Sequence, residues 1–213
     1  MRRTSIHVAS LLFLFVPLAI AQTISHEKER EQWQNIGEIF KAMTIVSGSA
    51  VADVGAGDGF LTVRLSPLVG VNGHVYAEDI LANRLDGLRK RAADAHLENI
   101  VCVLGTPDDP KLPSQLDAVV ILNSYHEMPL HAEMLRHICQ ALKTGGRLVI
   151  AEPSPRPGEE TRDQQVAKHH IASEFVAQEM AQAGLKILER RDDFARLPDG
   201  TGSYSIVVGE KTE

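Results

Sequence analysis

The chain has 213 residues, a length that suits one α/β domain, because division into several domains becomes common only beyond about 250 residues. Hydrophobic residues make up 44% of the chain and charged residues 23%, which excludes a disordered, collagen-like or multi-span membrane protein. The formal charge of -6, with no basic stripe interleaved with aromatic residues, argues against nucleic acid as a partner.

The first 21 residues have the features of a secretory signal peptide. Met1-Arg2-Arg3 is a basic start, residues 8–20 form an apolar run, and Ala19-Ile20-Ala21 is a small-x-small cleavage pattern. The run is shorter than the roughly 20 residues of a permanent membrane helix, and Pro17 interrupts it. We therefore predict cleavage after Ala21 and a secreted or periplasmic chain, residues 22–213, with no stable membrane span. An uncleaved membrane anchor or a misassigned start codon are the alternatives.

Strand and helix patterns then alternate along the chain, which predicts a mostly parallel sheet with helices on both faces. The last two strands are separated by a turn rather than a helix, so the final strand is expected to be antiparallel. The proline-rich, charged segment at 153–168 is expected to be a loop or short helix, and it could form a lid. The predicted helices cover residues 27–43, 60–68, 81–95, 130–142 and 173–183, and the predicted strands cover 50–54, 74–78, 99–104, 117–122, 147–151, 185–189 and 204–208.

A glycine-rich loop, Gly55-Ala56-Gly57-Asp58-Gly59, joins the first predicted strand to the next helix. Glycines at this position let the backbone approach a ligand closely. Phe60 stands where the dinucleotide fingerprint has its third glycine, and the Asp58 charge would repel a pyrophosphate, so a cofactor with a cationic group fits better. Asp79, 20 residues beyond Gly59 at a strand end, is placed to bind a ribose diol. Glu78 is expected to face the other side of the strand.

Three segments together, at residues 51–59, 75–79 and 142–150, resemble the class I S-adenosylmethionine-dependent methyltransferases in order and spacing. The resemblance spans residues 33–208. It implies a Rossmann-like three-layer sandwich with a mostly parallel seven-stranded sheet and an antiparallel last strand. It also implies S-adenosylmethionine as cofactor and methyl transfer to an unidentified acceptor, for which a small molecule is the default and a protein side chain the second choice. A secreted, non-catalytic S-adenosylmethionine-binding module is the alternative function, and an oxidoreductase is a third that Phe60 weakens.

The resemblance also implies which residues bind the cofactor. The glycine loop and the acid before it would hold the methionine part, Asp79 the ribose, the loop after the third strand the adenine, and Asn123 the sulfonium region. Many members have Asp followed by Ala in the adenine loop, where this chain has Thr106-Pro107. The predicted cofactor residues are Asp53, Gly55, Ala56, Gly57, Gly59, Asp79, Ile80, Thr106, Pro107, Asp108 and Asn123.

The segment that leaves the fourth predicted strand carries the candidate catalytic residues Tyr125, His126 and Glu127. It lies where ligands bind in open α/β sheets, outside the strand carboxyl ends. A neutral His126 could take a proton from a hydroxyl or amine acceptor. Two structural alternatives stay open: Tyr125 could pack under the adenine, and Glu127 could cap the following helix.

A metal site is not predicted from the sequence. No Cys/His cluster has zinc-binding spacing, and Leu130 stands where an H-E-x-x-H motif starting at His126 would need its second histidine. His169-His170 follows the flexible segment and could fold over the pocket, although adjacent histidines before a helix more often face solvent.

Overall fold

The computed structural model describes residues 18–213, so residues 1–17 of the predicted signal peptide lie outside the described part of the chain. The backbone of the first helix, α1 (Leu18–Trp33), runs across the predicted cleavage site after Ala21. Within residues 18–213, no helix combines the length and the apolar character needed to cross a membrane.

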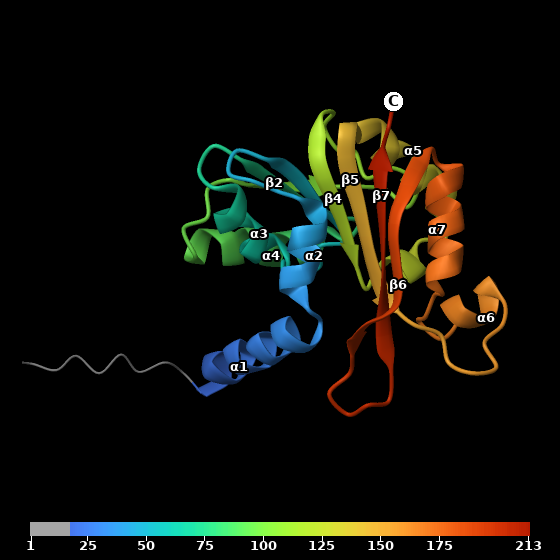
Figure 1. Cartoon of the computed structure of the whole chain (residues 1–213). Coiled ribbons are helices and arrows are strands. Elements are labelled where there is room, and N and C mark those ends of the chain that lie inside the picture. Colours follow the sequence, from blue (N-terminus) through green and yellow to red (C-terminus); the bar gives the residue numbers. More distant parts are fainter. Residues whose placement is uncertain (1–17) are drawn as a thin grey trace, which may run out of the picture.

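A seven-stranded sheet forms the centre of the molecule, with the strand order β3-β2-β1-β4-β5-β7-β6 (Figure 1). The first five strands are parallel, and β7 is antiparallel to both of its neighbours, which confirms the predicted fold class. The strands are β1 (Ala50–Val54), β2 (His74–Asp79), β3 (Ile100–Leu104), β4 (Leu116–Leu122), β5 (Leu142–Pro153), β6 (Leu185–Arg196) and β7 (Ser203–Lys211).

Helices cover both faces of the sheet, because the central strands bury side chains on both sides. In β4, Ala118 and Val120 contribute to the core under α2 (Ile36–Met43) and α3 (Thr62–Val69). The alternate residues Val119 and Ile121 pack under α5 (His131–Ala141) and α7 (Ser173–Gln182). α4 (Ala82–Asp94) packs against β2 and β3. The segment at 153–168, expected to be a loop or short helix, contains the short helix α6 (Arg162–Val166).

The helix predicted over 27–43 is two helices, α1 and α2. The break lies at Asn35, whose backbone is in the left-handed region with φ 52°. Asparagine tolerates this conformation better than most residues. Its side-chain amide donates a hydrogen bond of 2.8 Å to the carbonyl of Phe194, a contact 159 residues away along the chain. This long-range contact has no signature in the local apolar periodicity, so the pattern alone predicted a continuous helix.

The strand order reverses between β1 and β4, which lie next to each other although β2 and β3 separate them in the chain. The connections leaving β1 and β4 therefore go to opposite sides, and their separation opens a crevice at the carboxyl ends of the strands. The glycine loop follows β1, and the 3-10 helix η1 (Tyr125–Glu127) follows β4. The topology thus brings the predicted cofactor segment and the predicted acceptor segment to the same end of the sheet.

Candidate cofactor and acceptor site

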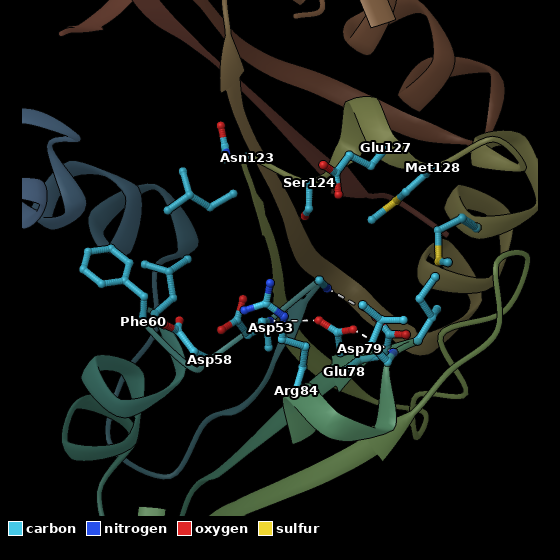
Figure 2. Close-up of a pocket in the computed structure, with 18 of the residues that line it drawn as sticks. Asp53, Asp58, Phe60, Glu78, Asp79, Arg84, Asn123, Ser124, Glu127 and Met128 are labelled. Carbon is cyan, nitrogen blue, oxygen red and sulfur yellow. Dashed lines mark hydrogen bonds between the residues drawn. The ribbon is translucent and has the colours of Figure 1, made fainter. Parts of the chain in front are cut away.

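A cavity of about 490 Å³ lies at the carboxyl ends of β1, β2 and β4 (Figure 2). Its size falls in the range of small-molecule sites, about 300–1,000 Å³. Figure 2 shows Phe60 and Asp58 on one side of the cavity and Glu127 and Met128 on the other. The predicted site residues that line it are Asp53, Gly55, Ala56, Gly57, Asp79, Ile80, Pro107, Asn123 and Glu127.

The glycine loop needs its glycines for different reasons. Gly55, Gly57 and Gly59 all have positive φ, at 71°, 56° and 83°, a conformation that costs other residues about 1–2 kcal/mol. A Cβ on Gly55 would lie 2.4 Å from the Ser124 hydroxyl oxygen, whereas a Cβ on Gly57 would meet no atom within 4 Å. A Cβ on Gly59 would lie 2.9 Å from Leu88, so Gly59 permits packing against α4 and does not line the cavity.

Two adjacent carboxylates at the end of β2 both contact the glycine loop. Asp79 accepts hydrogen bonds from the backbone N–H of Gly57 at 2.9 Å and of Leu81 at 2.8 Å. Glu78 accepts one from the Gly55 N–H at 3.3 Å and also lines the cavity. The expectation that Glu78 would face away is therefore wrong: it leaves the strand on the other face, but the loop from β1 crosses the strand end within its reach.

Five carboxyl groups and two guanidinium groups line the cavity, so acidic side chains outnumber basic ones on its wall. Burial raises the pKa of Asp53 to about 6, against the hydrogen bonds it accepts from Thr62. Burial also raises the pKa of Glu78 to about 8, although the Gly55 N–H opposes this, and the nearby charges of Asp79 and Asp53 add to the increase. The Glu78 Oε1 atom is buried without a hydrogen-bond partner. A ligand with positive charge and hydrogen-bond donors fits such a cavity, which agrees with the prediction of a cationic cofactor.

Sequence reasoning missed Arg30, which brings positive charge to the wall of the cavity. Its guanidinium carbon lies 4.0 Å from the centre of the Phe60 ring, and that of Arg64 lies 4.2 Å from the same ring. Arg64 also forms an ion pair with Glu27 of α1 at 3.3 Å. These contacts join α1 to the glycine-loop side of the site. Only the tertiary fold could reveal them, because α1 precedes β1 and carries no recognisable motif.

Besides Gly59, four predicted site residues do not line this cavity: Thr106, Asp108, Tyr125 and His126. The Thr106 hydroxyl donates to Asp108 at 2.8 Å, so the two side chains satisfy each other in the exposed loop after β3. Tyr125 is fully buried, and its hydroxyl donates to Glu179 of α7 at 2.6 Å. Burial and the Glu179 charge raise the pKa of Tyr125, so the phenol keeps its proton. His126 lies behind the wall and is 3% exposed.

The His126 ring is held by Glu152, a residue that sequence reasoning missed. Glu152 lies near the end of β5 and is 1% exposed. Its carboxylate accepts hydrogen bonds from the N–H groups of Ser124 and Tyr125, both at 2.8 Å, and lies 2.5 Å from His126 Nδ1. Burial alone would lower the pKa of His126, but the hydrogen bond and charge of Glu152 raise it above its ordinary value.

A second cavity, of about 240 Å³, begins at Asn123, which lines both spaces. Asn123 has a left-handed backbone, with φ 57°, and its amide oxygen accepts a hydrogen bond of 2.8 Å from the Tyr204 hydroxyl. The second cavity is lined in part by Arg156, Lys168 and His169. The predicted cofactor crevice therefore adjoins, at Asn123, a smaller cavity whose wall includes basic residues of the segment after β5.

Comparison with known proteins agrees with this fold. A family model for a methyltransferase domain matches residues 45–193. A demethylmenaquinone methyltransferase from Shouchella clausii is 30% identical over 128 residues, 60% of this chain and 54% of that protein. The chain thus spans about half the length of the curated relatives it matches.

Solved structures share the fold at low identity. A SAM-dependent methyltransferase from Aquifex aeolicus has a TM-score of 0.70 at 20% identity, covering 87% of this chain and 96% of that one. A geranyl diphosphate C-methyltransferase from Streptomyces coelicolor, in complex with Mg²⁺, geranyl diphosphate and S-adenosyl-L-homocysteine, has a TM-score of 0.70 at 16% identity and covers 86% and 82%. The chain therefore belongs to the methyltransferase domain family.

Proposed function

We propose that this chain transfers the methyl group of S-adenosylmethionine to a small-molecule acceptor. The observation that carries the proposal is the position of two neighbouring cavities that share Asn123, one lined by the glycine loop and one lined in part by the segment after β5. The cofactor supplies a methyl group already activated on a sulfonium. The chain then needs mainly to hold the acceptor in line with that methyl, which is a task of proximity and orientation.

The cavity offers a matching group for each part of the cofactor. Asp79 has a free lone pair on each carboxylate oxygen after its bonds to Gly57 and Leu81, and these can accept from the ribose hydroxyls. The carboxylates of Asp53, Asp58 and Asp79 on the wall compensate for the positive charge of the cofactor. Arg30, on the glycine-loop side of the wall, can pair with the methionine carboxylate.

The acceptor would enter from the side of Glu127 and the second cavity. His126 and Glu127 keep the acceptor-side role predicted for them, since they follow Asn123 in the chain, Glu127 lines the cofactor cavity and the buried His126 is next to it. Tyr125 is better assigned to positioning this segment through Glu179. The basic residues Arg156 and Lys168 favour an acceptor that is polar or negatively charged.

Calorimetry and turnover assays on the purified chain test the proposal. We expect binding of S-adenosylmethionine and S-adenosylhomocysteine but not of NAD. We also expect formation of S-adenosylhomocysteine with a member of a panel of hydroxyl, amine, thiol and carboxyl compounds, including demethylmenaquinone because the relatives are named for it. Cofactor binding without turnover on any acceptor would favour the non-catalytic binding module. Binding of NAD alone would refute both.

We further propose that the chain is exported and that its mature form begins at Gln22. The basic start, the apolar run and the small-x-small pattern of residues 1–21 support export independently of one another. Cleavage would remove two arginines and no acids, so the net charge would change from -6 to -8. Fractionation of source cells with N-terminal sequencing tests this: an intact Met1 in the cytoplasm would contradict export and leave the methyltransferase proposal untouched.

A further inference from the structure

Three side chains with metal-binding atoms lie together at the junction of the two cavities. They are His126, Glu127 and His169, and their ligand atoms all lie within 4.8 Å of one another. His126 Nε2 is 3.8 Å from Glu127 Oε1, and His169 Nδ1 is 3.8 Å from the same oxygen. His126 is buried, whereas Glu127 and His169 are exposed and free to adjust.

Glu152 fixes the His126 ring in the orientation that a metal ligand needs. An ionised carboxylate only accepts hydrogen bonds, so Nδ1, at 2.5 Å from Glu152, carries the proton. The lone pair is then on Nε2, the nitrogen that faces Glu127. A ring N–H given to a carboxylate is the usual support of a metal-binding histidine. The other carboxylate oxygen is held by two backbone N–H groups, so Glu152 cannot turn away without leaving them unpaired.

We propose that His126, Glu127 and His169 bind a divalent transition-metal ion of the zinc type. Two imidazole nitrogens and one carboxylate oxygen suit Zn²⁺, Co²⁺ or Fe²⁺ better than Mg²⁺ or Ca²⁺, which prefer oxygen ligands. In a tetrahedral site, metal–ligand bonds of about 2.0–2.2 Å place neighbouring ligand atoms roughly 3.3–3.6 Å apart. The observed separations therefore need to shrink only modestly, and the two exposed side chains can supply that movement.

The location places such a metal ion where it could bind the acceptor. Glu127 lines the cofactor cavity and His169 lines the second cavity, so the ion would lie between them. Three protein ligands leave coordination positions open for an oxygen of the acceptor. If the proposed methyl transfer holds, the metal would lower the pKa of a coordinated acceptor hydroxyl and fix its direction toward the cofactor. The binding site itself does not depend on that proposal.

The sequence analysis did not predict a metal because the third ligand is distant in the chain. His169 lies 43 residues after His126, in the turn after α6, where its backbone adopts φ 60°. No spacing motif links such positions. The rings of His126 and His169 are brought together, with centroids 5.4 Å apart, only when the segment after β5 folds back over η1.

Metal titration of the tag-free, chelator-treated full chain tests the proposal. By calorimetry we expect one equivalent of Zn²⁺ per chain, and Co²⁺ should give the visible absorption of a nitrogen- and oxygen-coordinated ion. His169→Ala should weaken Zn²⁺ binding at least tenfold, since even loss of an outer partner costs about 10–100-fold. His170→Ala is the matched control, because its Nδ1 faces Glu159 at 2.8 Å, and it should bind Zn²⁺ as the wild type does.

Glu152→Gln tests whether Glu152 positions the His126 ring. The readout is Zn²⁺ affinity, measured in a chain that remains folded. Glutamine can keep its oxygen on the two backbone N–H groups, but its amide then points at His126 Nδ1. The ring must move its proton to Nε2 to accept from the amide, and a protonated Nε2 cannot bind a metal. We expect Zn²⁺ affinity about 10–100-fold lower with an unchanged far-UV spectrum.

Two results would overturn the metal site: equal Zn²⁺ affinity in wild type and His169→Ala, or preference for Mg²⁺ or Ca²⁺ over Zn²⁺. Both leave the proposed methyl transfer standing, because cofactor binding is measured separately on the metal-free chain. Conversely, a chain that binds Zn²⁺ through His169 but does not bind S-adenosylmethionine would refute the proposed function and retain the metal site.

Discussion

Replacing Glu78 by glutamine is expected to stabilise the protein increasingly as the pH rises from about 4.5 to about 8 and to change little below that range. Glu78 is 2% exposed, one of its oxygens has no partner, and burial is the main reason that its pKa is raised from 4.5 to about 8. Asp79, Asp53 and Asp109 face it and add to the increase, while the exposed Arg84 shares the cavity wall. Glutamine has the same shape and carries no charge at any pH.

The sign follows from proton binding in the two states. In the unfolded chain the carboxyl group loses its proton near pH 4.5, whereas in the folded chain it keeps the proton up to about pH 8. The stability due to Glu78 is thus fully present below pH 4.5 and is lost as pH rises through about 8. Each pH unit in this window costs about 1.4 kcal/mol, so the total loss has an upper limit of about 5 kcal/mol.

Urea unfolding of the cofactor-free chain at several pH values between about 5 and 8 measures this effect. The variant should become progressively more stable than the wild type as the pH rises. Glu98→Gln, at an exposed position, is the control and should show no such trend. A difference between Glu78→Gln and wild type that stays constant over this range would refute the reasoning, because Glu78 would then have the same protonation in both states.

Three further predictions concern the cofactor cavity. Asp79→Ala should weaken S-adenosylmethionine binding by about 1.5–3 kcal/mol in calorimetry, and the exposed Asp86→Ala should not; similar losses from both would exclude the ribose role. Gly57→Ala should lower the free energy of unfolding by about 1–2 kcal/mol, because its backbone is left-handed. Gly55→Ala should cost about 1–3 kcal/mol more, because its Cβ would also clash with Ser124. Equal losses for the two variants in urea unfolding would show that this contact is unimportant. Arg30→Ala should lower the affinity for S-adenosylmethionine at least tenfold. It should not change the affinity for 5′-methylthioadenosine, because that ligand lacks the carboxylate. Equal losses for the two ligands would contradict pairing of Arg30 with the carboxylate.

The sequence by itself determined the layered α/β fold and its reversed last strand. The alternation of short apolar runs with helical periods is local, and the turn at 197–200 joins two strands too closely for a parallel connection. The glycine loop and Asp79 were equally readable, because a β-strand, tight turn and helix succeed one another within a few residues. Such motifs can be read from the sequence because backbone geometry and ligand binding both restrict residues that are neighbours in the chain.

The tertiary structure alone decided which side chains meet at the site. Arg30, Glu152 and His169 come from three different elements and converge on the junction between β1 and β4, and no local period records such convergence. The same holds for predicted site residues that do not line the cavity. Gly59 contacts Leu88, and Thr106 contacts Asp108, because packing in space and not position in a motif determines what each one touches.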